Sequence, residues 1–243
     1  MPSLSQQPDR ASSAKPDRHG PLPELLFVLT AVTGLVDAVS YLQLGHVFVA
    51  NMTGNVVFLG FAAAGAAGFS AAASLVAIAA FLAGALLGGW LGSRWGGHRG
   101  RFIAYATYIQ FFLFDAALVV SIKAADTSTG AASFFLIGLL AIAMGLQNAA
   151  ARRLAVPDLT TTVLTLTLTG LAADSRWAGG DGPRPMRRLA ATATMCLGAA
   201  VGALLALHFG TSSALALASA LLAFNVVRAY RFPTSSEPWT VGT

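Results

Sequence analysis

Long apolar runs alternate with short polar segments along most of the chain. The runs fall at residues 24–44, 47–66, 70–92, 102–122, 131–150, 156–173, 188–208 and 212–230. A helix needs about 20 predominantly apolar residues to cross a bilayer, and six of these runs meet that requirement. The pattern therefore predicts an all-α fold, a polytopic transmembrane helix bundle.

The second and sixth runs differ from the others because polar residues interrupt them. VFVANMTGNVVFLG (47–60) carries Asn51, Thr53, Gly54 and Asn55 at its centre, and VPDLTTTVLTLTLTGLAA (156–173) contains a proline, an aspartate and several threonines. Each segment begins with β-branched or helix-breaking residues, and the residues that follow favour a helix. We therefore expect two broken elements, each ending in a half-helix, in addition to six full spans.

Composition indicates that lipid surrounds most of this chain. It is 56% hydrophobic and only 10% charged, whereas soluble domains average about 25% charged residues. The net charge of +5 comes from basic residues that occur one to four at a time between apolar runs, as in cytoplasmic loops. The expected partner is the lipid bilayer, and no nucleic-acid partner is expected. Residues 1–23 predict a disordered cytoplasmic tail, and residues 232–243 a C-terminal tail.

The basic residues also favour one orientation. If both broken elements enter and leave the membrane on the same side, Lys123 is the only one of the 15 Lys and Arg residues outside. If all eight runs crossed, Arg94, Arg99, Arg101, Arg152 and Arg153 would lie outside instead. The positive-inside rule favours the first arrangement, with both termini in the cytoplasm.

The chain resembles itself at an offset of about 110 residues. TGLVDAVSYL (33–42) aligns with MGLQNAAARR (144–153), MTGN (52–55) with LTLT (164–167), and FLAGALLGG (81–89) with MCLGAAVGA (195–203). These alignments pair Gly34 with Gly145, Asp37 with Asn148, Thr53 with Thr165, Asn55 with Thr167, and Gly84 and Gly88 with Gly198 and Gly202. Three full spans in each half would invert the second half relative to the first. We expect an inverted repeat of residues 24–122 and 131–231.

Inverted repeats with paired broken helices are typical of secondary transporters, which bind substrate at the breaks. Irregular backbone at membrane depth requires surrounding protein or a water-filled cavity, so the breaks predict a polar pocket between the halves. The expected substrate-binding residues are Asn51, Thr53, Gly54, Asn55, Gln147, Asn148, Thr165 and Thr167. The alternative is that these side chains only cap and join helices, as such residues do routinely in membranes.

Two carboxylates, Asp37 and Asp115, lie inside apolar runs. An ionisable residue within a membrane span is by default a functional hypothesis, so both are candidates for proton coupling. The alternative is an aspartate that ties helices together through hydrogen bonds. The repeat counterparts, Asn148 and Asn225, are uncharged, so any pocket between the halves is electrically asymmetric.

Motifs for enzyme chemistry are missing from the sequence. It contains no nucleophile elbow, phosphate-binding loop, CxxC or HExxH pattern, so we expect no enzyme, no cofactor and no metal site.

The favoured function is a secondary transporter or permease for a small solute, with proton coupling as one option. A non-transporting membrane scaffold or partner-binding protein is the alternative, and an intramembrane enzyme using Asp37 and Thr53 is a third. A chain of 243 residues is small for a transporter, which is compatible with a homodimer.

Three stretches resemble the YoaK-like family of bacterial integral membrane proteins, whose domain has no assigned function. They are GLVDAVSYLQLG (34–45), VFVANMTGNVVFLG (47–60) and GLQNAAARRL (145–154), and the resemblance extends over residues 24–230. It implies a multi-pass protein of the bacterial inner (plasma) membrane and no particular activity. Leu166 stands where the family commonly has the glycine of a TG pair, which departs from the pattern at the second broken element.

Overall fold

The structure is a computed structural model that describes residues 19–124, 127–128, 130–157, 159, 161, 164–180 and 185–241. The described residues form eight α-helices and no β-strand. The helices are α1 (Leu22–Gln43), α2 (Met52–Ala63), α3 (Ala71–Trp95), α4 (Arg99–Lys123), α5 (Gly130–Leu154), α6 (Leu164–Ala173), α7 (Pro185–Phe209) and α8 (Thr211–Ala229). Most of the tail expected at residues 1–23 lies outside the described residues, and α1 begins within its last part.

The helix lengths separate two groups. Helices α1, α3, α4, α5, α7 and α8 are long and apolar enough to cross a bilayer. Helices α2 and α6 have 12 and 10 residues, too few for a crossing. The prediction of a polytopic all-α bundle, with six full spans and two half-helices, is confirmed.

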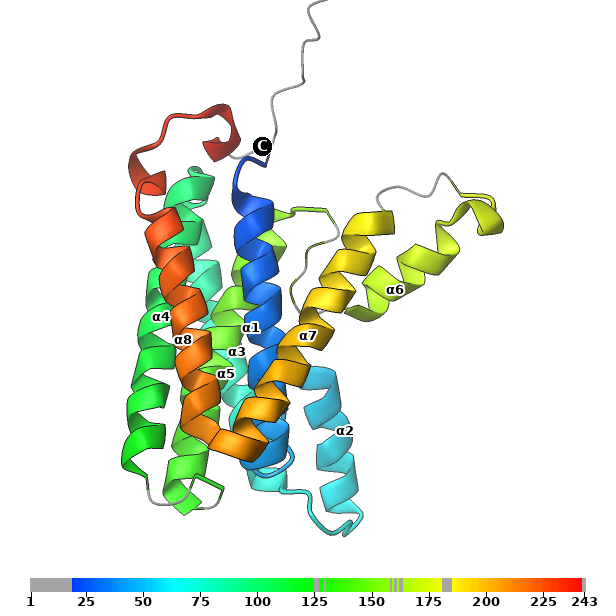
Figure 1. The fold of residues 1–243 in the computed structure, drawn as a ribbon, viewed down its shortest axis with the longest axis vertical. Coiled ribbons are helices and arrows are strands. Elements are labelled where there is room, and N and C mark those ends of the chain that lie inside the picture. Colours follow the sequence, from blue (N-terminus) through cyan, green and yellow to red (C-terminus); the bar gives the residue numbers. More distant parts are fainter. Residues whose placement is uncertain are drawn as a thin grey trace, which may run out of the picture.

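The two half-helices lie on the same flank of the bundle and run toward opposite ends (Figure 1). Helix α2 packs on α3, and α6 packs on α7. Each begins near mid-height of the bundle, α2 after the segment that follows α1, and α6 after the segment that follows α5 (Figure 1). The two N-terminal ends therefore face a common region at membrane depth.

Glycines allow α3 and α5 to approach within backbone contact. A Cβ added to Gly84 of α3 would collide with the carbonyl oxygen of Ile142, and a Cβ added to Gly145 of α5 would collide with that of Phe81. Small residues permit this close approach of helices in membranes, where packing and not the hydrophobic effect holds spans together. The crossing fixes Phe81 and the C-terminal half of α5 beside each other.

A second crossing, between α1 and α7, has the same construction. Gly198 of α7 lies against the carbonyl oxygen of Ala31, and Gly34 of α1 lies against that of Met195. Under the sequence repeat, Gly198 and Gly34 are the counterparts of Gly84 and Gly145. The two halves thus use equivalent glycines for equivalent contacts, which supports an inverted repeat.

The C-terminal segment folds onto one end of the bundle. The Trp239 side chain is only 4% exposed, and its ring lies 5.0 Å from that of Phe232. The Arg101 Nε donates a hydrogen bond to the carbonyl oxygen of Pro233 at 2.9 Å. The start of α1, the link between α3 and α4, and this segment therefore share one end of the bundle (Figure 1), as the six-span arrangement requires.

Candidate functional site

The first broken element is an extended segment that doubles back along α1. Gly45 and His46 have φ angles of 91° and 55°, in the left-handed region that permits a sharp reversal. Residues 47–51 form no helix or strand before α2 begins at Met52. Their backbone N–H and C=O groups need partners, because an unpaired one is costly in a membrane.

Two polar side chains supply partners for this segment, and a third caps the helix that follows it. The Asp37 Oδ1 accepts a hydrogen bond from the Ala50 N–H at 2.9 Å. The Asn55 side chain accepts from the Phe48 N–H at 2.9 Å and donates to the Phe48 carbonyl at 2.6 Å. The Asn51 side chain caps α2 by accepting from the Gly54 N–H at 3.3 Å. Much of the polarity in VANMTGN therefore satisfies the backbone of the break itself.

Aromatic rings brace the same segment. Phe48 stacks between Tyr41 of α1 and Phe58 of α2, with ring centroids 5.2 and 5.5 Å apart. A Cβ added to Gly54 would lie 2.7 Å from the Phe48 ring. Gly54 thus makes room for Phe48, the residue that Asn55 also holds.

A cavity opens where α2 and α6 begin, and we call it the central cavity. Its volume is about 500 Å³. It is lined by Ala50, Asn51, Met52, Thr53, Gly54, Val57, Phe58, Phe81, Asn148 and Thr165. Thr53 of α2 and Thr165 of α6 are counterparts in the sequence repeat, and both side chains are exposed. The cavity therefore has hydroxyls from both half-helices on a wall that is otherwise partly aromatic.

A second cavity adjoins the central cavity and shares Phe81 and Asn148 with it. Its volume is about 800 Å³, and because Arg152 and Arg153 line it we call it the arginine cavity. The arginines occupy the last turn of α5, at the end of the bundle where α1 begins (Figure 1). The two cavities together extend from that end toward the start of α2.

The structure gathers five of the predicted substrate-binding residues around the central cavity. These are Asn51, Thr53, Gly54, Asn148 and Thr165. The Asn148 amide also donates to the Met144 carbonyl at 3.0 Å. Their function as solute ligands stays a prediction.

Asn55, Gln147 and Thr167 are placed differently from the sequence expectation. They do not line the central cavity. Asn55 is the one buried residue of α2 and Thr167 the one buried residue of α6, so these repeat counterparts face the bundle while Thr53 and Thr165 face the cavity. For Asn55, the geometry supports the structural alternative.

Gln147 belongs to a buried network that joins three spans. Its Oε1 accepts from Gln110 of α4 at 2.6 Å, and its Nε2 donates to the Thr33 hydroxyl of α1 at 2.8 Å. The side chain is 1% exposed. Paired polar groups of this kind hold membrane helices together, so the geometry supports the helix-joining alternative for Gln147, and its contact with a solute stays a prediction.

The two aspartates have different environments. Asp37 is buried and does not line the central cavity. Its carboxylate accepts a hydrogen bond from the N–H of Ala50, and Ala50 lines that cavity. Asp115 is exposed on the outer side of α4, and it lines neither the central nor the arginine cavity. The geometry therefore keeps Asp37 as the better-placed candidate for proton coupling, and that role stays a prediction for both.

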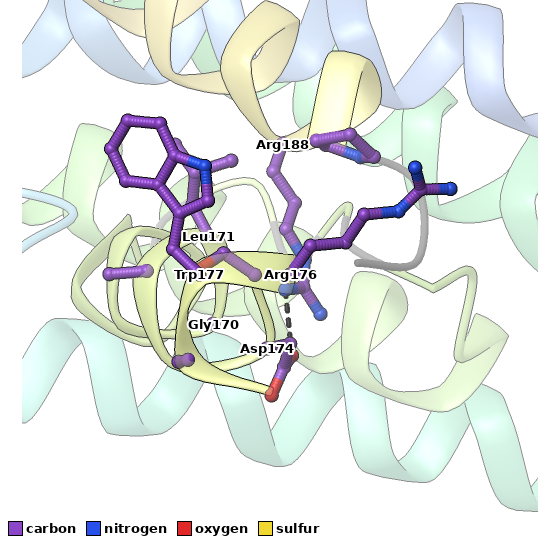
Figure 2. A pocket seen from close by; sticks show the side chains of 10 residues that line it. Gly170, Leu171, Asp174, Arg176, Trp177 and Arg188 are labelled. Carbon is purple, nitrogen blue, oxygen red and sulfur yellow. Dashed lines mark hydrogen bonds and ion pairs between the residues drawn. The ribbon is translucent and has the colours of Figure 1, made fainter. Parts of the chain in front are cut away.

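A third cavity, of about 760 Å³, lies at the far end of α6, beside the 3-10 helix η1 (Arg176–Ala178) and α7. Figure 2 shows the Asp174 carboxylate directed at the Arg188 guanidinium, with an N–O distance of 2.7 Å. Trp177 and Arg176 extend to opposite sides in this view. None of the sequence-predicted site residues lines this cavity.

Sequence reasoning missed the apolar residues of the site. Phe58 and Phe81 form part of the central cavity wall, and neither carries a polar signal. In the sequence, Arg152 and Arg153 indicated only the orientation of the chain, yet both line the adjoining cavity. One signal in the sequence could have placed them at the site: they follow Asn148 by about one helical turn on α5.

Comparisons with known proteins give the family. A family described as "Protein of unknown function (DUF1275)" matches residues 25–227. The UPF0700 transmembrane protein YoaK of Bacillus subtilis (strain 168) is 34% identical over 160 residues. This alignment covers 62% of the present chain and 65% of YoaK. No solved structure matches significantly. The chain is an integral, multi-pass membrane protein and belongs to the DUF1275 family.

Proposed function

We propose that this protein is a secondary transporter or permease of the bacterial inner membrane and that the central cavity holds a small solute during transport. One observation carries the proposal: the N-terminal turns of two half-helices from opposite halves of the chain line a single cavity. Breaking a helix at membrane depth is costly unless the break is buried in protein or lines a water-filled cavity. Secondary transporters use paired breaks to present helix ends to their substrates.

The arrangement also suits alternating access. Helices α2 and α6 run from the central cavity toward opposite ends of the bundle (Figure 1). Much of the surface of each half-helix is exposed, and each packs mainly on one long helix. A rocking motion of one half against the other would open the cavity first to one side and then to the other, as in other inverted-repeat transporters.

The cavity has the size and lining of a small-molecule site. A volume of about 500 Å³ falls within the range of ligand pockets, and such pockets combine apolar walls with a few placed polar groups. Here Phe58 and Phe81 supply the apolar wall, and Thr53, Thr165 and Asn148 supply the polar groups. If the polar residues at the start of α2 and α6 had only a structural function, no open volume would be needed between them.

Uptake into proteoliposomes tests the proposal, with Asp37→Asn as the coupling variant. We expect at least one solute of a panel of amino acids, carboxylates, sugars and inorganic ions to enter faster with wild-type protein than with empty liposomes. If Asp37 carries a proton, a pH gradient should accelerate wild-type uptake and leave Asp37→Asn unaffected. The amide oxygen of asparagine can still accept the Ala50 N–H, so the variant should fold normally.

Two results would count against this account. Equal responses of wild type and Asp37→Asn to the pH gradient would remove the proton role and leave transport standing. The absence of uptake for the whole panel, from folded protein, would instead favour the non-transporting scaffold or partner-binding alternative.

A further inference from the structure

The charges around the two adjoining cavities are of one sign. Among the described residues that line the central and arginine cavities, Arg152 and Arg153 are the ionised side chains, and no carboxylate is present. Arg153 extends along the C-terminal end of α3, where a Cβ added to Gly92 would meet its side chain at 2.6 Å. Both arginines are exposed, so a solute in the arginine cavity would meet two positive charges.

Within the part of the membrane-embedded region that the structure describes, the acidic groups are engaged or face elsewhere. The Asp37 carboxylate accepts from the Ala50 N–H and lines neither cavity. Asp115 lies on the outer side of α4. Asp174 forms an ion pair with Arg188 at the third cavity. The central cavity therefore has no carboxylate to bind a cation among the described residues that line it.

Backbone dipoles add to the positive potential. Helix α2 begins with Met52, and its first turn lines the central cavity, as does Thr165 at the second position of α6. A helix N-terminus carries a partial positive charge and exposed N–H donors. Two such ends at one cavity, with two arginines in the adjoining cavity, form a graded path that favours negative charge.

We propose that the solute carries a negative charge and that the arginine cavity and the central cavity together form its binding path. This inference rests on the proposed transport function and names its substrate class: a small anion with a carboxylate, phosphate or other oxyanion group. Arg152 and Arg153 attract the anion at the end of α5, and the hydroxyls of Thr53 and Thr165 donate to it where the half-helices begin. Phe81 and Asn148 lie between the two positions.

Thr53→Asp is the decisive substitution, with Thr53→Asn as its matched control. Position 53 is in the first turn of α2, where aspartate is favoured by the helix dipole, and its side chain is exposed, so both variants should fold. Aspartate places a negative charge in the central cavity and should repel an anion. Asparagine has nearly the same shape and no charge.

Binding is measured as saturable thermal stabilisation of the full-length protein in nanodiscs of phosphatidylcholine, a lipid without net charge. The probes are sodium acetate, nitrate, sulfate and inorganic phosphate, compared with sodium gluconate at equal ionic strength. We expect at least one probe to stabilise the wild type, to stabilise Thr53→Asn less strongly because an amide N–H replaces the hydroxyl donor, and to lose its effect on Thr53→Asp. Arg152→Gln should weaken binding about tenfold, the factor expected for a lost charge-assisted contact. Arg94→Gln, an exposed arginine that lines neither cavity, should not.

The outcomes separate this inference from the proposed transport. Saturable anion binding that Thr53→Asp removes, without uptake of any solute, would keep the anion site and contradict transport. Uptake of a neutral or cationic solute that is unchanged or increased in Thr53→Asp would keep transport and overturn the anion inference. A stabilising effect of phosphatidylglycerol nanodiscs, with none from the soluble probes, would assign the arginines to lipid headgroups and also overturn it.

Discussion

The substitution Asn55→Ala is expected to destabilise the protein by up to about 6 kcal/mol, the cost of leaving the two part-buried backbone groups of Phe48 without partners. The Asn55 side chain is 0% exposed and holds both the N–H and the carbonyl of Phe48. Alanine can replace neither bond. The measurement is the melting temperature of the detergent-solubilised protein, which should fall by many degrees.

Thr53→Ala is the matched control for Asn55→Ala. It lies two residues earlier on the same helix, but its side chain is exposed toward the central cavity. Its melting temperature should stay close to that of the wild type. If Asn55→Ala were as stable as Thr53→Ala, Asn55 would not stabilise the break. The prediction from the sequence that Asn55 binds the solute would then be favoured again.

The second large effect is expected for Gly145→Ala. The added Cβ would collide with the carbonyl oxygen of Phe81, so α3 and α5 must move apart. Overpacking of this kind typically costs about 1–3 kcal/mol, and a clash with backbone is harder to relieve than a clash with a flexible side chain. Gly34→Ala, at the repeat counterpart facing Met195, should cost about the same in the crossing of α1 and α7.

Gly138→Ala gives the matched control for Gly145→Ala on the same helix. Nothing lies within 4 Å of a Cβ added there, so the substitution should be neutral or slightly stabilising through the higher helix propensity of alanine. The comparison is again the melting temperature. Equal stability of Gly138→Ala and Gly145→Ala would show that the helices do not cross as closely as the structure has them.

The sequence was sufficient to predict the spans and the breaks. Apolar runs of spanning length identify helices whose environment is lipid, and the polar centre of VANMTGN marks a place where a continuous apolar helix is impossible. The repeat alignment was informative about packing because it paired glycines. Gly34 and Gly145 hold equivalent positions in the two crossings, which no single apolar run would have indicated.

The direction of individual side chains could not be predicted. Thr53 and Asn55 are two residues apart, yet one faces the central cavity and the other is buried. Helix α2 has apolar residues on all sides, so periodicity does not determine which face contacts the bundle. Hydrogen bonds between distant residues could not be predicted either. The bond from Gln110 to Gln147 joins residues 37 positions apart, and only the fold brings them together.

The central claim is that the solute passes through the central cavity, and filling that cavity tests it most directly. Thr165 lines the cavity, whereas Thr169, one turn later on α6, is exposed but is not among its lining residues. Tryptophan at position 165 would occupy much of a volume of about 500 Å³, while the same residue at position 169 would leave it open.

The decisive measurement is proteoliposome uptake by Thr165→Trp and Thr169→Trp, reconstituted in equal amounts and with matched melting temperatures. We predict that Thr165→Trp loses uptake of the transported solute and that Thr169→Trp retains it. Retained uptake in Thr165→Trp, or equal loss in both variants, would contradict the assignment of the central cavity as the transport site.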